Sequence, residues 1–317
     1  RSVFIGGGTP SLLSGDQIKN IMQVVQKYFL IKEEAEITME ANPGTLTKKN
    51  LSAYKDAGIN RLSMGLQSAD NSCLYLLGRI HTWEEFLKNY ELARKAGFEN
   101  INIDLMSGLP GQTMSIYKKT LEKVMALRPE HISAYSLILE EGTPFYESEE
   151  IHKKIPNEEA DREMYQFTKE ILAENGYDRY EISNYAKQGY QSKHNLTYWY
   201  YDNYYGIGLG ACSKIDGQII EHSRSLTKYL NGDFKTTTID ETKEETMFNQ
   251  IMMSLRLKEG LDLKKFKERY QEDACILYKE AVTRNIEKGR LMIENDYLKA
   301  TQEGQYVLND ILIDFMK

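Results

Sequence analysis

Short apolar segments alternate with amphipathic segments along the first half of the chain. The apolar segments lie at residues 3–5, 36–40, 61–66, 100–106 and 131–139. Between them apolar residues recur at helical spacing, and Ile18, Met22 and Val25, for example, fall on one helical face. Strands that alternate with helices predict an α/β fold, with a parallel sheet and the helices outside it.

Helix-start signals support the same division of the chain. Ser14 stands three residues before Gln17, and Thr82 three residues before Glu85, which is the spacing of a capping box. Five such strand–helix units predict an incomplete β/α barrel of the (β/α)6 type. Because Arg1 leads directly into an apolar strand, we expect that a native N-terminal segment precedes it and carries the first strand. Chemistry in such folds lies at the carboxyl ends of the strands.

The second half of the chain changes character twice. A helix starting after Asn157 and ending near Gly176 is followed by an aromatic, glycine-containing segment, 180–214, that we expect to form strand and loop. From Thr242 the chain reads as helical, and a strand–turn–strand near its end resembles a winged helix. We therefore expect a partial barrel over 1–155, its completion over 156–235 and a mostly helical domain over 236–317.

Composition narrows the classes of function. The net charge of −7 argues against a general nucleic-acid binder, and the winged-helix-like end is not strongly basic either. No apolar run approaches the roughly 20 residues of a membrane-spanning helix. Cys73, Cys212 and Cys275 are too far apart in sequence to predict a disulfide framework or a metal site, so a cytoplasmic location is expected.

A glycine-rich loop follows the first strand. Gly7, Gly8 and Thr9 belong to the segment GGGTP, residues 6–10. Glycines allow a backbone to approach a ligand closely, and the exposed N–H groups can bind a carboxylate. A tight strand-to-helix turn without a ligand would have the same sequence.

Polar residues also lie at the ends of later strands. Glu40 ends the second strand, Gln67 the third and Asp104 lies in the fourth, while Arg79 comes shortly after the third. Each residue alone could be a cap or a surface ion pair. Together they bring carboxylates, an amide and a guanidinium to one barrel mouth, a set able to hold an amino acid and a ribose.

The order of these motifs is similar to one family. GGGTP (6–10), EANPG (40–44), GLQS (65–68), GRIH (78–81) and DLMSGLPGQT (104–113) resemble the S-adenosylmethionine (SAM) frame of the radical SAM proteins in the coproporphyrinogen-oxidase and HemW group. The resemblance implies that the SAM contacts are Gly7, Gly8, Thr9, Glu40, Gln67, Arg79 and Asp104. It also implies that the protein handles a tetrapyrrole.

One family feature is absent from the sequence. The family holds a [4Fe-4S] cluster through a CxxxCxxC loop that follows the first strand, and this chain contains no such spacing. The three cysteines present cannot replace it. The loop is therefore expected upstream of Arg1, and the chain as it stands is predicted to bind no cluster and to initiate no radical reaction.

A second motif separates the subfamilies. His194-Asn195-Leu196-Thr197-Tyr198-Trp199 matches HNxxYW, which resembles the haem chaperones of the HemW type. The resemblance implies haem as cargo, with His194 as a contact and Tyr198 and Trp199 against the macrocycle. In the alternative interpretation both aromatic residues are core residues and His194 bonds a backbone carbonyl.

The sequence leaves three functions open. The preferred one is a HemW-like chaperone that binds SAM and haem and delivers haem to apo-haemoproteins. The alternative is an oxygen-independent coproporphyrinogen III oxidase, whose substrate is a porphyrinogen. A radical SAM enzyme acting on another substrate is the third, because a fold does not name a substrate.

The segment 206–211, GIGLGA, matches a dinucleotide-binding pattern without its context. The residues that follow, 212–215, read as a strand rather than a helix, and no β-α-β unit surrounds them. We expect these glycines to allow close backbone packing instead.

Overall fold

The computed structural model describes residues 1–316, which form two compact units. The first unit comprises residues 1–179 and 183–194, and the second comprises 180–182 and the chain from Asn195 onward. These limits differ from the domain boundaries expected at 155 and 235. Residues 156–179 group with the first unit because α7 packs on α5, β4 and β5, which a division at 155 would separate.

The first unit contains the expected succession of strands and helices. Its strands are β1 (Ser2–Ile5), β2 (Glu36–Ala41), β3 (Arg61–Gln67), β4 (Asn100–Ser107), β5 (His131–Ser136), β6 (Asp178–Arg179) and β7 (Asn184–Ala186). Its helices are the 3-10 turn Pro10–Leu12, α1 (Gly15–Tyr28), α2 (Lys48–Asp56), α3 (Asn71–Leu76), α4 (Trp83–Lys95), α5 (Met114–Ala126), α6 (Glu149–Lys154) and α7 (Glu158–Glu174). Helix α8 (Lys193–Trp199) crosses from the first unit into the second.

The strands form one sheet in the order β1-β2-β3-β4-β5-β7-β6. Strands β1 to β5 are parallel, whereas β7 pairs antiparallel with β5 and β6 antiparallel with β7. Within residues 1–316 the sheet stays open, with β1 and β6 at its edges. The α/β fold with a parallel sheet is confirmed, and an antiparallel ribbon follows the fifth parallel strand.

Strand β5 is shorter than its sequence pattern predicts. The apolar run continues to residue 139, but the strand ends at Ser136. Its neighbour β4 ends at Ser107, whose carbonyl accepts a hydrogen bond from the backbone N–H of Leu137. Beyond that point β5 has no β4 backbone to pair with, so an apolar sequence alone cannot extend the ladder.

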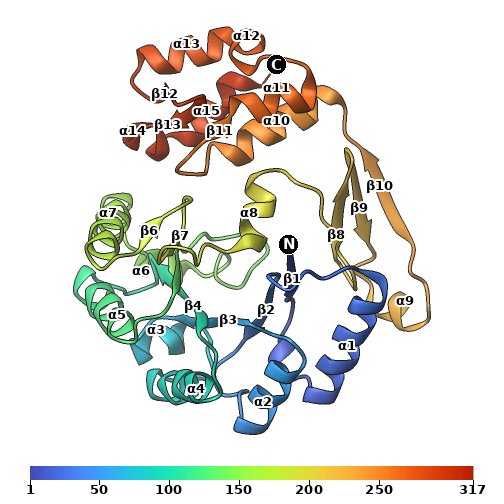
Figure 1. Cartoon of the computed structure of the whole chain (residues 1–317). Coiled ribbons are helices and arrows are strands. Elements are labelled where there is room, and N and C mark those ends of the chain that lie inside the picture. Colours follow the sequence, from blue (N-terminus) through green and yellow to red (C-terminus); the bar gives the residue numbers. More distant parts are fainter. Residues whose placement is uncertain (317) are drawn as a thin grey trace. The chain divides into compact units, whose positions relative to one another are not determined.

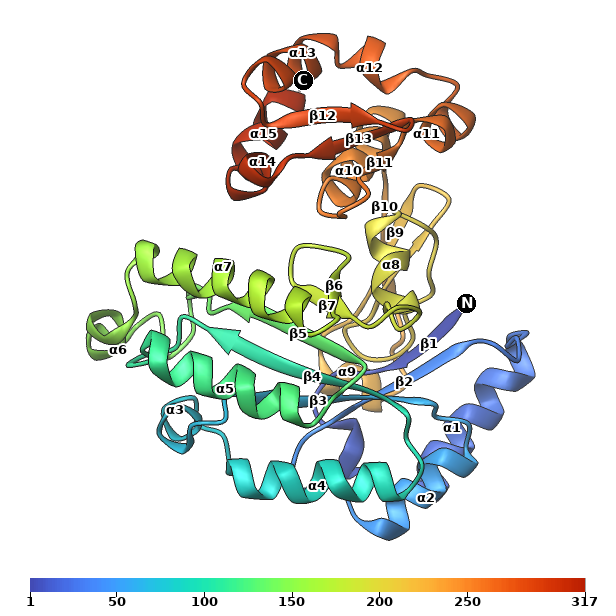
Figure 2. The ribbon, with the colours of Figure 1, turned by 60° about the vertical axis from the view of Figure 1, so that its left-hand side comes forward.

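The two faces of the sheet differ in polarity. On β3, Leu62, Met64 and Leu66 are fully buried in the apolar core under the outer helices. Figure 1 shows α1, α2, α4 and α5 forming this outer layer, and Figure 2 shows α7 beside α5. Because side chains alternate along a strand, Arg61 and Ser63 lie on the opposite, inner face. The inner face is therefore the polar one.

The predicted helix starts are confirmed. Ser14 and Gln17 form a reciprocal capping box at α1, and Thr82 and Glu85 form one at α4. Each box satisfies two backbone N–H groups that a helix leaves without an internal partner. Asn157 accepts from Ala160 N and caps α7.

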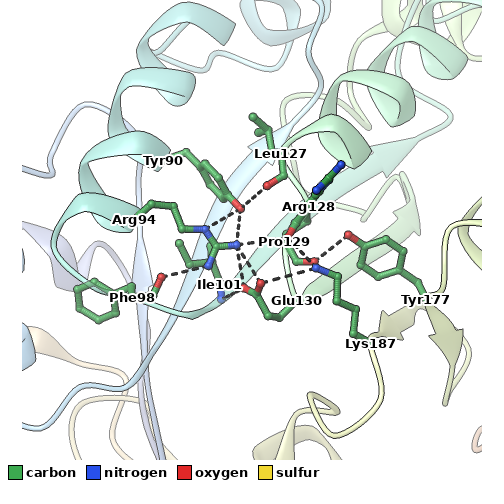
Figure 3. A network of polar contacts seen from close by, with 10 residues as sticks. All are labelled: Tyr90, Arg94, Phe98, Ile101, Leu127, Arg128, Pro129, Glu130, Tyr177 and Lys187. Carbon is green, nitrogen blue, oxygen red and sulfur yellow. Dashed lines mark hydrogen bonds and ion pairs between the residues drawn. The ribbon is translucent and has the colours of Figure 1, made fainter.

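A polar network joins elements at the amino-terminal edge of the sheet (Figure 3). Glu130, just before β5, accepts from the Arg94 guanidinium at 2.8 Å and from the Ile101 backbone N–H at 3.1 Å. The Arg94 side chain also bonds the Tyr90 hydroxyl and the carbonyl of Phe98. One carboxylate thus ties the end of α4, the start of β4 and the start of β5 together.

The second unit contains two small sheets and a set of helices. Its elements are β8 (Cys212–Ile215), β9 (Gln218–His222), α9 (Leu226–Leu230), β10 (Thr236–Asp240), α10 (Lys243–Ser254), β11 (Leu261–Asp262), α11 (Leu263–Tyr270), α12 (Ala274–Leu277), α13 (Lys279–Glu287), β12 (Leu291–Glu294), β13 (Tyr297–Ala300), α14 (Gln302–Tyr306) and α15 (Leu308–Phe315). The sheets have the orders β10-β9-β8 and β11-β13-β12. The β12–β13 hairpin among helices matches the winged-helix-like ending that the sequence predicts.

Gly206 lies directly against a neighbouring strand. A Cβ added there would meet the carbonyl oxygen of Cys212 at 2.1 Å. The strand predicted over residues 212–215 is β8, and the bridge between Tyr204 and Lys214 brings this loop back onto it. The glycine is therefore needed for close backbone packing, as expected.

We expect Gly206→Ala to lower the stability of the second unit by about 2 kcal/mol, because the added methyl group forces backbone apart. Gly232→Ala is a poor control, since its φ of 80° adds strain of its own. Gly8→Ala is the better one, because a Cβ there meets no atom within 4 Å. Thermal unfolding of both variants measures the difference, and equal midpoints would contradict the packing argument.

Candidate functional site

The loop after β1 presents open backbone at the carboxyl edge of the sheet. The Gly7 N–H donates to the Glu40 carboxylate at 3.2 Å, and Gly7 has a φ of 108° that favours glycine. A Cβ at Gly7 or Gly8 would meet no heavy atom within 4 Å. Side-chain packing therefore does not require glycine at either position, whereas the backbone conformation favours it at Gly7.

The same loop is fastened to the segment that follows β2. The Asn42 amide donates to the Thr9 hydroxyl at 3.3 Å, and the Asn42 backbone N–H donates to the Ser11 hydroxyl at 3.1 Å. Thr45 donates to Ser11 as well, at 2.7 Å. Thr9 belongs to the GGGTP loop and Asn42 to the EANPG segment, so their hydrogen bond links the two predicted motifs.

Two carboxylates share this part of the sheet. Asp104 on β4 accepts from the Asn102 amide at 2.7 Å and from the Ser63 hydroxyl at 3.4 Å. Burial raises the pKa of Asp104 above its ordinary value. Burial raises the pKa of Glu40 too, the Gly7 N–H opposes that rise, and the negative charge of Asp104 adds to it. Both groups would gain from a cationic ligand.

Gln67 and Arg79, two more of the predicted SAM residues, lie near Tyr135. Its hydroxyl donates to the Gln67 amide oxygen at 3.4 Å. Burial of the hydroxyl raises the pKa of Tyr135 to about 12, Asp104 and Glu40 contribute to the rise, and the positive charge of Arg79 opposes it. Gln67 itself is 4% exposed and has a φ of 70° where β3 bulges against β4.

The structure thus brings the predicted SAM residues of the first unit to one edge of the sheet, with Gly8 next to Gly7 in the open loop. Tyr135, a residue 37% exposed there, was not among the predicted site residues. The signal was present, because His131, Ser133 and Tyr135 alternate with apolar residues along β5 and so share the inner face.

His131 is a second residue that the sequence did not single out. It is fully buried, and its Nδ1 lies 2.6 Å from the Asn102 amide oxygen. Burial lowers the pKa of His131 well below its ordinary value, and the Arg61 charge lowers it further. The inner face therefore carries a continuous polar network from His131 through Asn102 to Asp104.

His194 lies elsewhere on the first unit. Its ring stacks on Phe4 with centroids 4.5 Å apart, and its Nδ1 lies 3.4 Å from the Ser2 hydroxyl. Ser2 and Phe4 both belong to β1, so His194 lies against that strand, and the Phe4 ring lies between it and Gly6 of the glycine loop. Burial lowers the pKa of His194 to about 4, which keeps the imidazole neutral near pH 7.

The HNxxYW segment is helical, which corrects the expectation of strand and loop. It forms α8, whose first backbone N–H groups, those of Lys193 and His194, donate to the carboxylate of Glu36. A carboxylate at that position stabilises a helix start. Glu36 lies 157 positions before Lys193, so no local signal predicted the helix.

The aromatic end of the motif, in the second unit, has protein partners of its own. Tyr198 packs edge-on against Tyr204 with ring centroids 4.7 Å apart. The carbonyl of Trp199 accepts from the Ser254 hydroxyl at 3.2 Å. Both residues are half-buried, as packed aromatic residues would be.

Comparison with known proteins separates two regions of the chain. Residues 1–124 match the model of the radical SAM superfamily, and residues 242–307 match that of the HemN C-terminal domain. The heme chaperone HemW of Lactococcus lactis is 35% identical over 320 residues, covering 100% of this chain and 84% of that protein. The chain belongs to the HemW family of radical SAM proteins.

Other HemW proteins match this chain with similar identity and coverage. HemW of Bacillus subtilis is 34% identical, covering 100% of this chain and 85% of that protein, and HemW of Escherichia coli is 35% identical, covering 100% and 84%. The solved structure of the coproporphyrinogen III oxidase HemN from Escherichia coli has a TM-score of 0.84, covers 99% of this chain and 77% of its own, and is 22% identical. At that identity the likeness establishes the shared fold.

The cysteines of this family member do not form a cluster site. Cys73, in α3, is 3% exposed, and burial raises its pKa to about 11, which disfavours the thiolate that binds iron. Cys73 is a buried packing residue of this helix. Within residues 1–316 no group of three or more His, Cys, Asp or Glu side chains could hold a metal ion. The residues present do not fit an iron–sulfur cluster.

Within the described part of the chain, no helix combines the length and the apolar character that crossing a membrane demands.

Proposed function

We propose that this protein binds SAM and haem and delivers haem to haemoproteins. The observation that supports this function is similarity along the whole chain to proteins named heme chaperones, at 34–36% identity in six of them. The fold alone does not separate this function from porphyrinogen oxidation, because the oxidase HemN shares it.

The carboxyl edge of the sheet has hydrogen-bonding groups and charges that suit SAM. SAM carries an ammonium group, a carboxylate, a sulfonium and a ribose with two hydroxyls. The Gly8 N–H and the Arg79 guanidinium suit the carboxylate. The carboxylates of Glu40 and Asp104, whose negative charge is only partly balanced, suit the ammonium group and the ribose.

The haem contact is proposed at His194. A neutral imidazole is the form that binds a metal, and the lowered pKa of His194 keeps it in that form. A hydrogen-bond partner on the other ring nitrogen orients a ligating histidine, and the Ser2 hydroxyl lies near Nδ1 at 3.4 Å. The aromatic residues of the motif then support α8 by packing.

A haem titration followed by Soret absorption tests the proposal. We expect saturable binding by the protein and about tenfold weaker binding by His194→Ala, because an axial ligand is lost. His152→Ala, an exposed histidine of α6, is the matched control and should bind as the parent does. With the pKa of His194 near 4, affinity should hold as the pH falls to about 5 and weaken below it, when the proton competes with the iron.

Two outcomes would contradict the proposal. Equal haem binding by the parent and His194→Ala would remove His194 as a contact. Anaerobic conversion of coproporphyrinogen III in the presence of SAM and a reductant, without saturable haem binding, would favour the oxidase function instead.

A further inference from the structure

Glu36 makes three hydrogen bonds to the start of α8. It is the first residue of β2 and is 6% exposed. Its Oε1 accepts from the Ser192 hydroxyl at 3.2 Å and from the His194 backbone N–H at 3.1 Å. Its Oε2 accepts from the Lys193 backbone N–H at 3.0 Å. Both oxygens of this buried carboxylate are thus used on one turn of helix.

This capping differs from that of other helices in the first unit. At α1 and α4 the cap is the residue next to the helix, Ser14 or Thr82. At α8 the acceptor comes from a strand more than 150 positions earlier in the sequence. The carboxylate satisfies N–H groups that the helix start leaves unpaired, and its charge is favoured by the helix dipole.

The His194 ring is fixed by the neighbouring strand. In the β1–β2 ladder Ser2 pairs with Glu36, and Phe4 pairs with Thr38. Ser2 and Phe4 both contact the His194 ring, at 3.4 Å and through 4.5 Å stacking. One pair of strands therefore holds both the backbone of His194, through Glu36, and its imidazole.

We propose that Glu36 is a positioning residue for His194, setting the direction from which its imidazole meets the haem iron. This inference rests on the proposed role of His194 in haem binding. A ligand must be held within roughly 0.5 Å of its productive position by residues behind it. Glu36 bonds the backbone of His194 itself, so losing the carboxylate releases the first turn of α8 and shifts the ring on Phe4.

The experiment compares variants of equal bulk. Glu36→Met removes both acceptor oxygens while filling a similar volume, and Glu36→Gln keeps one acceptor oxygen. Glu34→Ala is the control, because Glu34 is exposed and only its backbone carbonyl is bonded, by the Lys193 ammonium. Haem is titrated into each protein, and affinity, Soret position and thermal unfolding are recorded.

We expect haem affinity to fall about tenfold in Glu36→Met, with a shifted Soret band, and less in Glu36→Gln, because removing a residue behind a metal ligand has effects of this size. Glu34→Ala should match the parent. A merely structural role would lower the unfolding temperature without moving the Soret band of the haem that still binds.

The outcomes separate the two proposals. If His194→Ala loses haem while folded Glu36→Met keeps the parent's affinity and spectrum, Glu36 is not a positioning residue. If Glu36→Met does not fold, Glu36→Gln decides, and parental affinity and spectrum in that variant would overturn the inference. If His194→Ala binds as the parent does, the proposed haem contact itself has failed, whatever the Glu36 variants show.

Discussion

Glu130→Ala is expected to lower the free energy of unfolding of the first unit by about 3 kcal/mol. The carboxylate is 12% exposed and pairs with the Arg94 guanidinium, which is 27% exposed. Its removal leaves that cation without its carboxylate and the backbone N–H of Ile101 without its acceptor. Ile101 is fully buried and Arg94 is largely shielded from water, so both losses are costly.

Thermal unfolding followed by circular dichroism measures this effect, which corresponds to a fall of roughly 8 °C in the midpoint. Glu91→Ala is the matched control on α4, because its ion pair with Lys95 is exposed and 3.7 Å long. An exposed pair of this kind contributes under about 0.5 kcal/mol. Glu130→Ala and Glu91→Ala with equal midpoints would show that the network of Figure 3 does not stabilise the fold.

Asp104→Asn is expected to weaken SAM binding about 30-fold, or about 2 kcal/mol, because a charged acceptor becomes a neutral one. The substitution keeps an oxygen that can accept from the Asn102 amide. Glu40→Gln should act in the same direction. The exposed Asp56→Asn, at the end of α2, is the control and should leave affinity unchanged.

The free energy of unfolding, unlike the SAM affinity, should not fall in Asp104→Asn. Burial raises the pKa of Asp104 in the folded state, so the stability linked to its protonation is present at low pH and lost as the pH rises. At neutral pH the ionised carboxylate therefore opposes folding, and a neutral amide removes that penalty. At pH 7 we expect the unfolding temperature of Asp104→Asn to equal that of the parent or to lie slightly above it.

The same shifts predict the pH dependence of SAM binding. The raised pKa values of Asp104 and Glu40 mean that these carboxylates take up protons at a higher pH than ordinary side chains. Affinity for a cationic ligand should therefore fall as the pH is lowered, earlier than unperturbed carboxylates would allow. Calorimetric titration of SAM over a pH series checks this. Unchanged SAM affinity in both Asp104→Asn and Glu40→Gln would remove these two carboxylates as SAM contacts.

The sequence predicted much of the candidate site because its signals are local. Gly7 and Gly8 follow an apolar strand, Glu40 lies at the end of another, and Asp104 lies within a third. The carboxyl ends of parallel strands meet at one edge, so their grouping follows from the fold class. Tyr135 was missed because it lies within a run that reads as apolar, where only the period of two reveals the inner face.

The sequence alone determined the strands β1 to β4, the starts of α1 and α4, the α/β class and the family motifs, since each depends on neighbouring residues. The tertiary structure alone decided where β5 ends, that the HNxxYW segment is helical, and which atoms hold His194. Those features depend on partners such as Glu36, which lies 158 positions from His194. A hydrogen bond between residues so distant leaves no local pattern, because only the folded sheet brings its donor and acceptor together.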